Sequence, residues 1–220
     1  MRKQDTSGAW YSGIPSWAEL KKMAQAGTID RVLSEGDLIP IRLADGEENA
    51  IRVTHDQAGN MFFVFENCLD KPFSMNHDAT NAGGWKKSEM RAYLNREIAK
   101  RLPDDLLKAI EPISIEQKMP GKTYVKSRDK LFLLSKEQVF GESKLSAPEK
   151  GVSQLRIFKG AKERRVKIWS GNSFFWWLRS PHSGGNYGFV CVTSSGAVGC
   201  ATAYYAYGVA PGFCLIEPKE

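Results

Sequence analysis

The strongest constraint on the fold lies between Trp169 and Ile216, where aromatic residues are concentrated and charge is nearly absent. The run Phe174-Phe175-Trp176-Trp177-Leu178-Arg179-Ser180-Pro181 contains four consecutive aromatic residues, and no residue between Arg179 and Glu217 is charged, although 25% of the chain is. We predict that the two tryptophans anchor the core. We expect Arg179 to make structural hydrogen bonds to loop carbonyls or a carboxylate, not to contact a ligand.

Composition limits the class of protein. With 220 residues, 42% of them hydrophobic, the chain can bury a core of its own. The net charge of +6 could suit nucleic acid, but basic and acidic residues are interleaved and no nucleic-acid motif accompanies them. We therefore interpret the basic residues, including Lys159 to Lys167, as a solvated surface and expect no nucleic-acid partner.

Cysteine use and hydropathy indicate where the chain is made. Cys68, Cys191, Cys200 and Cys214 are too few for a disulfide scaffold, so we expect reduced or buried thiols. No apolar run reaches the roughly 20 residues needed to span a bilayer, and no signal-peptide core follows Met1. The expectation is a protein made in soluble form without a signal peptide or membrane insertion.

The first half of the chain contains clear signals for local structure. Ser16-Trp17-Ala18-Glu19 is a capping box that should begin a short helix ending near Gly27. Alternating residues in 37–43 and 50–54 predict a hairpin. Met61 to Phe65 is apolar on both faces and should lie inside the sheet. We treat residues 1–35 as a helical segment or tether and residues 36–220 as the main domain.

Two helices and a short strand are expected next. An apolar stripe predicts a helix over residues 88–99, and Pro103-Asp104-Asp105 should begin a second helix. Residues 112–129 are polar and basic. Residues 130–135 should form a short buried strand, followed by a helical turn from Ser135 to Val139.

An ordered set of motifs resembles a known family. The set comprises Gly84-Trp85 with Ser88, Met90-Arg91 and Leu94-Asn95, then Asp129 to Ser135, Trp177-Leu178-Arg179-Ser180-Pro181, and Gly208-Val209-Ala210-Pro211-Gly212-Phe213. Together these resemble the DUF6273 family over about residues 36–216. Many relatives end with Val-Arg-Pro-Ala where this chain has Val209-Ala210-Pro211-Gly212, so no role of that arginine is carried over.

The resemblance implies an α+β, C-type-lectin-like fold with small antiparallel sheets, two main packed helices and a C-terminal hairpin region that presents a ligand surface. It is similar to the variable proteins of diversity-generating retroelements, some of which are phage tail receptor-binding or cell-surface proteins. Adenine-directed variation in those systems excludes Lys, Glu, Gln, Met and Trp, and none of these occurs from His182 to Ile216. A diversified surface and a fixed surface of the same fold both remain open.

The expected ligand surface is rich in tyrosine, which gives a large amphipathic contact area at little conformational cost. In the hairpin, Val190, Val192 and Val198 should point inward, with a turn at Ser194-Ser195-Gly196. At least one of two consecutive tyrosines should be buried if they lie in a strand. The candidate ligand-binding residues are His182, Asn186, Tyr187, Phe189, Cys191, Thr193, Tyr204, Tyr205 and Tyr207.

These patterns favour binding over catalysis. The histidines His55, His77 and His182 lack metal-ligand spacing, and no phosphate cradle or nucleophile motif occurs. No Asp or Glu lies between Arg164 and Ile216, which disfavours a calcium site there. We expect a non-enzymatic protein without a cofactor, able to form a homo-oligomer, that binds a protein or carbohydrate ligand on a bacterial surface. The alternative is a structural phage virion or tail component whose surface packs on neighbouring subunits.

Overall fold

The structure is a computed structural model that describes residues 14–119, 124–141 and 144–219. The part of the expected tether in residues 1–13 lies outside the described residues. None of the described helices is long and apolar enough to cross a membrane.

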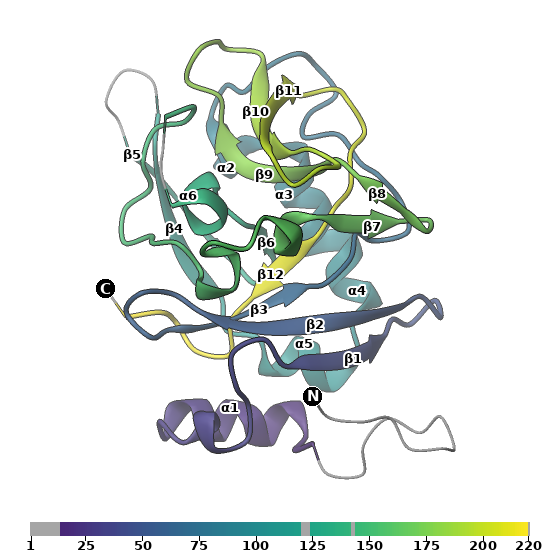
Figure 1. Cartoon of the computed structure of the whole chain (residues 1–220), viewed down its shortest axis with the longest axis vertical. Coiled ribbons are helices and arrows are strands. Elements are labelled where there is room, and N and C mark those ends of the chain that lie inside the picture. The colour runs from purple at the N-terminus through teal and green to yellow at the C-terminus, as the bar shows by residue number, and fades with distance from the viewer. Residues whose placement is uncertain (1–13, 120–123, 142–143, 220) are drawn as a thin grey trace.

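A five-stranded antiparallel sheet forms the centre of the molecule (Figure 1). Its strands, in spatial order, are β1 (Leu38–Arg42), β2 (Glu48–His55), β3 (Met61–Phe65), β12 (Pro211–Phe213) and β6 (Phe132–Leu133). The predicted hairpin is confirmed as β1 and β2. The prediction that residues 61–65 lie inside the sheet is also confirmed, because β3 pairs with β2 on one side and with β12 on the other. The two ends of the domain are thus joined in one sheet.

Three smaller antiparallel sheets complete the strands and confirm an α+β protein with small sheets. They are β4 (Ile113–Lys118) with β5 (Tyr124–Asp129), β7 (Lys167–Trp169) with β8 (Asn172–Phe174), and β9 (Trp176–Pro181), β10 (Gly188–Val192) and β11 (Val198–Thr202). The β4–β5 hairpin was not predicted. Its polar residues form a strand because Gln117, Ser127 and Asp129 are buried with hydrogen-bond partners in place of apolar packing.

The helices are short. They are α1 (Trp17–Gln25), α2 (Gly84–Lys87), α3 (Glu89–Tyr93), α4 (Ala99–Arg101), α5 (Asp104–Ala109) and α6 (Lys136–Phe140), the π-helical turn η2 (Leu94–Ile98), and the 3-10 turns η1 (Ile29–Arg31), η3 (Arg156–Phe158) and η4 (Lys162–Arg165). The helix expected over 88–99 is α3, η2 and α4 in succession, and α5 is the second expected helix. Capping boxes begin α1 at Ser16 and α6 at Ser135 as their sequences indicate.

The described part of the N-terminal segment packs against the main domain. In Figure 1, α1 lies at one end of the molecule, below β1 and β2. The Trp17 ring meets the rings of Phe63 in β3 and Phe213 in β12 edge-on, each at 5.7 Å between centroids. Leu20 and Leu33 are buried in the same hydrophobic core as these strands. Side chains from residues 14–35 therefore contribute to the same hydrophobic core as the large sheet.

The aromatic run connects the large sheet to the C-terminal sheet. Trp176 and Trp177 are fully buried, which confirms them as core anchors. Each indole N–H donates to a backbone carbonyl, Trp176 to Arg165 at 2.9 Å and Trp177 to Phe73 at 3.0 Å. Burying an indole is favourable when its polar N–H is satisfied. The run thus fixes β9 as the base on which β10, β11 and the following turn are built.

Candidate ligand-binding surface

A turn after β11 brings two tyrosines to the surface. The Ala203 N–H donates to the Tyr187 carbonyl at 2.9 Å, and the Ala203 carbonyl accepts from the N–H groups of Met75 and Asn76. The chain therefore leaves the sheet at this residue. Tyr204 and Tyr205 follow in the turn and are 49% and 46% exposed. The prediction that one of them is buried is wrong, because alternation between two faces applies to a strand and these residues lie outside one.

Tyr204, Tyr205, Tyr207 and Trp177 form what we call the aromatic ladder. The Tyr204 and Tyr205 ring centroids are 4.7 Å apart, and the Tyr205 and Tyr207 rings are nearly parallel at 6.1 Å. Tyr207 is partly buried and lies 4.8 Å from the buried ring of Trp177. Stacked aromatic pairs add stabilisation beyond the area they bury. The exposed rings are therefore held in position by a chain of contacts that ends in the core.

The loop between β9 and β10 supplies the neighbouring surface. Asn186 and Tyr187 are exposed, and His182 is partly exposed with its ring 6.4 Å from that of Tyr187. The Asn81 side-chain amide donates to the carbonyls of His182 and Gly185, and its N–H donates to the Asn186 carbonyl. The loop is thus fixed from beneath by a buried amide, and its Tyr187 backbone is hydrogen-bonded to the start of the tyrosine turn.

Two predicted surface residues of the hairpin are buried. Phe189 and Cys191 in β10 are 0% and 1% exposed, so the prediction that they point outward is wrong. β10 is the central strand of its sheet, between β9 and β11, and both of its faces are covered. Val190 and Val192 are buried as predicted, but Val198 in the edge strand β11 is 39% exposed, contrary to expectation.

The turn of the hairpin has the predicted position. The backbone turns at Ser194 to Gly196, and Gly196 has a positive φ of 76°. Thr193 is partly exposed, and its hydroxyl accepts from the Ala197 N–H at 3.1 Å. Of the nine candidate residues, those on the surface or partly exposed are His182, Asn186, Tyr187, Thr193, Tyr204, Tyr205 and Tyr207.

The tyrosine hydroxyls of this surface and the thiol of Cys191 stay protonated near neutral pH. The hydrogen bond to Tyr205 raises the pKa of the Tyr204 hydroxyl, and desolvation raises the pKa of Tyr207. Burial raises the pKa of Cys191 to about 12, so this thiol stays protonated. All four cysteines are free thiols, and only Cys200 is exposed. No group of three His, Cys, Asp or Glu side chains placed to hold a metal ion occurs within residues 14–119, 124–141 and 144–219.

A buried ion pair supports β9 from inside. The Arg179 guanidinium donates to the Glu149 carboxylate, to the Leu133 carbonyl at 2.7 Å and to the Gln138 amide oxygen at 2.9 Å. Both charged side chains are 2% exposed. This confirms the structural role predicted for Arg179. Its partner carboxylate, supplied by the loop before η3, had no sequence signal that distinguishes it from a surface glutamate.

Comparison with known proteins places the chain in a family. The family model described as "Domain of unknown function (DUF6273)" matches residues 59–217, well over half of the chain. The chain belongs to the DUF6273 family. No curated protein and no solved structure matches it significantly. The family match includes the aromatic ladder and the buried ion pair, whereas β1 and β2 precede it.

Proposed function

We propose that this DUF6273 protein is a non-enzymatic ligand-binding protein and that the turn bearing Tyr204 and Tyr205 is the centre of its binding surface. The observation that carries the proposal is that both rings are nearly half exposed yet stacked on a ladder that ends at buried Trp177. A rigid, exposed aromatic surface loses little conformational entropy on binding.

The neighbouring residues suit the same role. Asn186 and Tyr187 add a donor, acceptors and a further exposed ring, and the loop that carries them is bonded to Ala203 beside the tyrosine turn. Tyrosine, asparagine and serine are the residues that antibody surfaces use for adaptable contacts. The ligand we propose is a protein or carbohydrate on a bacterial surface, met by a receptor-binding or adhesion protein.

We further propose the C-type-lectin-like arrangement and a retroelement-diversified history for this surface. The small antiparallel sheets and the C-terminal hairpin suit the first. The absence of Lys, Glu, Gln, Met and Trp from His182 to Ile216 supports the second, as does the exposure of Asn186, Tyr187, Tyr204 and Tyr205. A neighbouring reverse-transcriptase gene with a near-copy of the codons for residues 170–216, differing opposite template adenines, is the observation that would establish it.

The binding test compares tyrosines of the proposed binding surface with an exposed tyrosine elsewhere on the protein. Labelled protein is titrated onto a panel of bacterial cells and an immobilised glycan panel, and the Tyr204→Ala/Tyr205→Ala double variant is compared with Tyr124→Ala. Tyr124 lies on β5 and is 50% exposed, so it controls for the loss of an exposed tyrosine. We expect the double variant to bind at least about tenfold more weakly and the control to bind normally. Equal binding by all three proteins would remove the proposal.

The alternative is a structural virion or tail component in which the same tyrosines pack on neighbouring subunits. Exposed aromatic rings suit a subunit interface as well as a ligand surface. This alternative requires a stable oligomer that dissociates in the double variant, which light scattering after size-exclusion chromatography measures. A monomer that binds cells would favour the receptor-binding function.

A further inference from the structure

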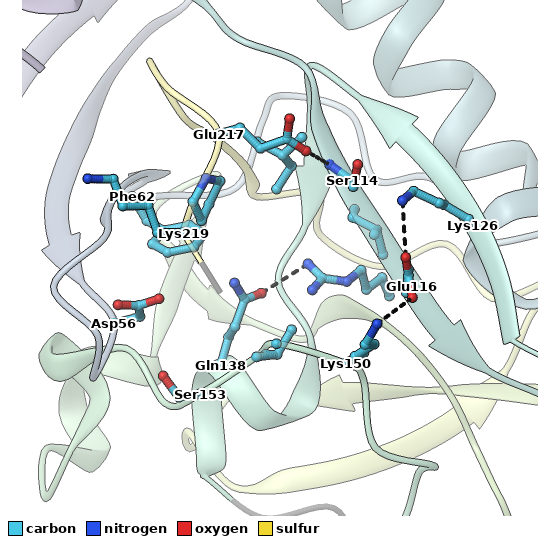
Figure 2. Close-up of a pocket in the computed structure, with 16 residues that line it drawn as sticks. Asp56, Phe62, Ser114, Glu116, Lys126, Gln138, Lys150, Ser153, Glu217 and Lys219 are labelled. Carbon is cyan, nitrogen blue, oxygen red and sulfur yellow. Dashed lines mark hydrogen bonds and ion pairs between the residues drawn. The ribbon is translucent and has the colours of Figure 1, made fainter. Parts of the chain in front are cut away.

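A separate cavity of about 280 Å³ lies between the large sheet, the β4–β5 hairpin, α6 and the C-terminal segment (Figure 2). Figure 2 shows Asp56 and Ser153 on one side of it, Glu116 and Lys150 on the opposite side, and the Gln138 side chain between them. The segments that line it are far apart in sequence, so the cavity exists only in the folded domain. None of the aromatic-ladder residues lines it.

The Gln138 side chain offers a hydrogen-bond donor to the cavity. Gln138 is 3% exposed, and its amide oxygen accepts from the Ser135 N–H at 2.9 Å and from Arg179 at 2.9 Å. Its Nε2 group donates to no atom in the described part of the chain. The fixed oxygen leaves the NH₂ group as the part available to the cavity.

Acceptors lie across the cavity from this donor. Asp56 is 5% exposed, and each of its carboxylate oxygens accepts one hydrogen bond from Asn60, both at 2.8 Å. Each oxygen therefore keeps a lone pair for a second donor. The Ser153 hydroxyl oxygen accepts from the Gln57 N–H at 3.1 Å, which leaves its O–H able to donate. A molecule that fills this space must both donate and accept hydrogen bonds.

Most of the charges around the cavity are paired. Glu116 contacts Lys126 at 3.0 Å and Lys150 at 3.6 Å, Glu217 contacts Arg128 at 3.2 Å, and Arg179, which lines the cavity, is paired with Glu149. Asp56 and Glu217 are the other anionic lining residues, and Lys219 is the other cationic one. Because most of these charges already have partners, the cavity offers little unpaired charge to a charged ligand. The apolar part of the wall comprises Phe62, Ile113, Ile115, Val152 and Pro218.

From this set of groups we infer that the cavity binds a small neutral polyhydroxyl compound the size of a monosaccharide. A sugar hydroxyl donates to Asp56 and accepts from Gln138 at the same time, and the C–H faces of the ring lie against apolar side chains. The volume is near the lower end for small-molecule sites, which run from about 300 to 1,000 Å³. This site is independent of the proposed tyrosine surface.

The test measures binding of D-glucose, D-galactose, D-mannose and N-acetyl-D-glucosamine by isothermal titration calorimetry, with L-serine as a zwitterionic probe and inorganic phosphate as an anionic one. We expect saturable binding of at least one sugar and none of serine or phosphate. Asp56→Asn, which removes the carboxylate, should weaken sugar binding at least about tenfold. Val152→Trp, a change in a loop residue of the wall, should abolish it by filling the cavity.

Matched variants locate the site and separate it from the tyrosine surface. Leu38→Trp adds the same ring at an exposed position on β1 and should leave sugar binding unchanged, as should Tyr204→Ala/Tyr205→Ala. Thermal unfolding confirms that each variant is folded. If Asp56→Asn does not fold, Val152→Trp decides the question. The inference is overturned if no sugar binds saturably at tens of millimolar, if serine or phosphate binds in place of sugar, or if Val152→Trp binds as the original protein does.

Discussion

Apart from Arg179, strands β9 and β10 carry no charge and neither does the turn after β11, yet the strands and the turn differ completely in exposure. Every residue of β9 and β10 is buried, whereas Tyr204, Tyr205 and Ala206 in the turn are all exposed. The absence of charge has a different cause in each. In the strands the absence of charge reflects burial on both faces. In the turn it leaves an exposed aromatic surface with no charged side chain that would have to be desolvated when a ligand binds. An uncharged sequence is therefore evidence of a binding surface only after burial is known.

Of the predicted changes, breaking the Arg179–Glu149 ion pair beneath β9 should cause the largest loss of stability. Glu149→Ala leaves the Arg179 guanidinium buried without its carboxylate, and removing one partner of a buried pair costs about 3–5 kcal/mol. We expect a loss of this size in the free energy of unfolding, measured by urea denaturation at neutral pH. The cause is an unpaired buried charge, so the loss should depend little on salt.

Two variants control for this result. Glu116→Ala removes a carboxylate whose lysine partners are well exposed, and it should change stability little. The double variant Glu149→Ala/Arg179→Met removes both charges and should recover part of the lost stability, because the uncompensated charge is gone. A Glu149→Ala protein as stable as the Glu116→Ala protein would contradict the role assigned to the pair.

The next largest effect should come from the inner end of the aromatic ladder. Tyr207→Ala removes a partly buried ring that packs on Trp177 and Phe175, and we expect a loss of about 2 kcal/mol in unfolding free energy. Tyr205→Ala removes an exposed ring and should cost about 0.5 kcal/mol or less. Urea denaturation of the two variants measures the difference. Equal losses would mean that Tyr207 contributes no more to the stability of the fold than the exposed Tyr205 does.

Signals within a few residues predicted the local structure well. The capping box at Ser16, the helical turn beginning at Ser135, the apolar strand 61–65 and the paired tryptophans all appear where expected, because each depends on contacts that neighbouring residues already specify. The structural role of Arg179 was predictable for a related reason. A single arginine in an uncharged aromatic run must find acceptors inside the fold.

Features that depend on distant segments were not predictable. Alternation in β10 indicates that two faces differ, but it does not reveal that other parts of the chain cover both, so Phe189 and Cys191 were placed outside. The exposure of Tyr204 and Tyr205 depends on Ala203 bonding to Met75, Asn76 and Tyr187, contacts that no local pattern contains. The polar β4–β5 hairpin was missed for the same reason, since its buried polar groups have partners in segments far along the chain.

The smallest expected effect is at His55, a buried histidine whose carboxylate partners reach the surface, unlike the fully buried Arg179–Glu149 pair. The His55 ring contacts Glu35 at 2.8 Å and Asp30 at 3.2 Å, and it connects β2 to the segment after α1. Its hydrogen bond to Glu35 raises the pKa of His55 in the folded protein. The stabilisation from the protonated ring is therefore complete below the ordinary histidine pKa of about 6.5 and is lost as the pH rises through the higher folded value.

Because Glu35 and Asp30 are partly exposed, solvent screening should limit this contribution to about 1 kcal/mol or less. As the pH rises above about 6.5, we expect the unfolding free energy of the original protein to fall more steeply than that of His55→Gln. The matched control, His77→Gln, changes a histidine that is exposed and should keep the original slope. Identical slopes for His55→Gln and the original protein would show that the cluster does not stay protonated in the fold. A steeper fall that persists in Glu149→Ala would show that the two polar clusters act independently, one through burial and the other through protonation.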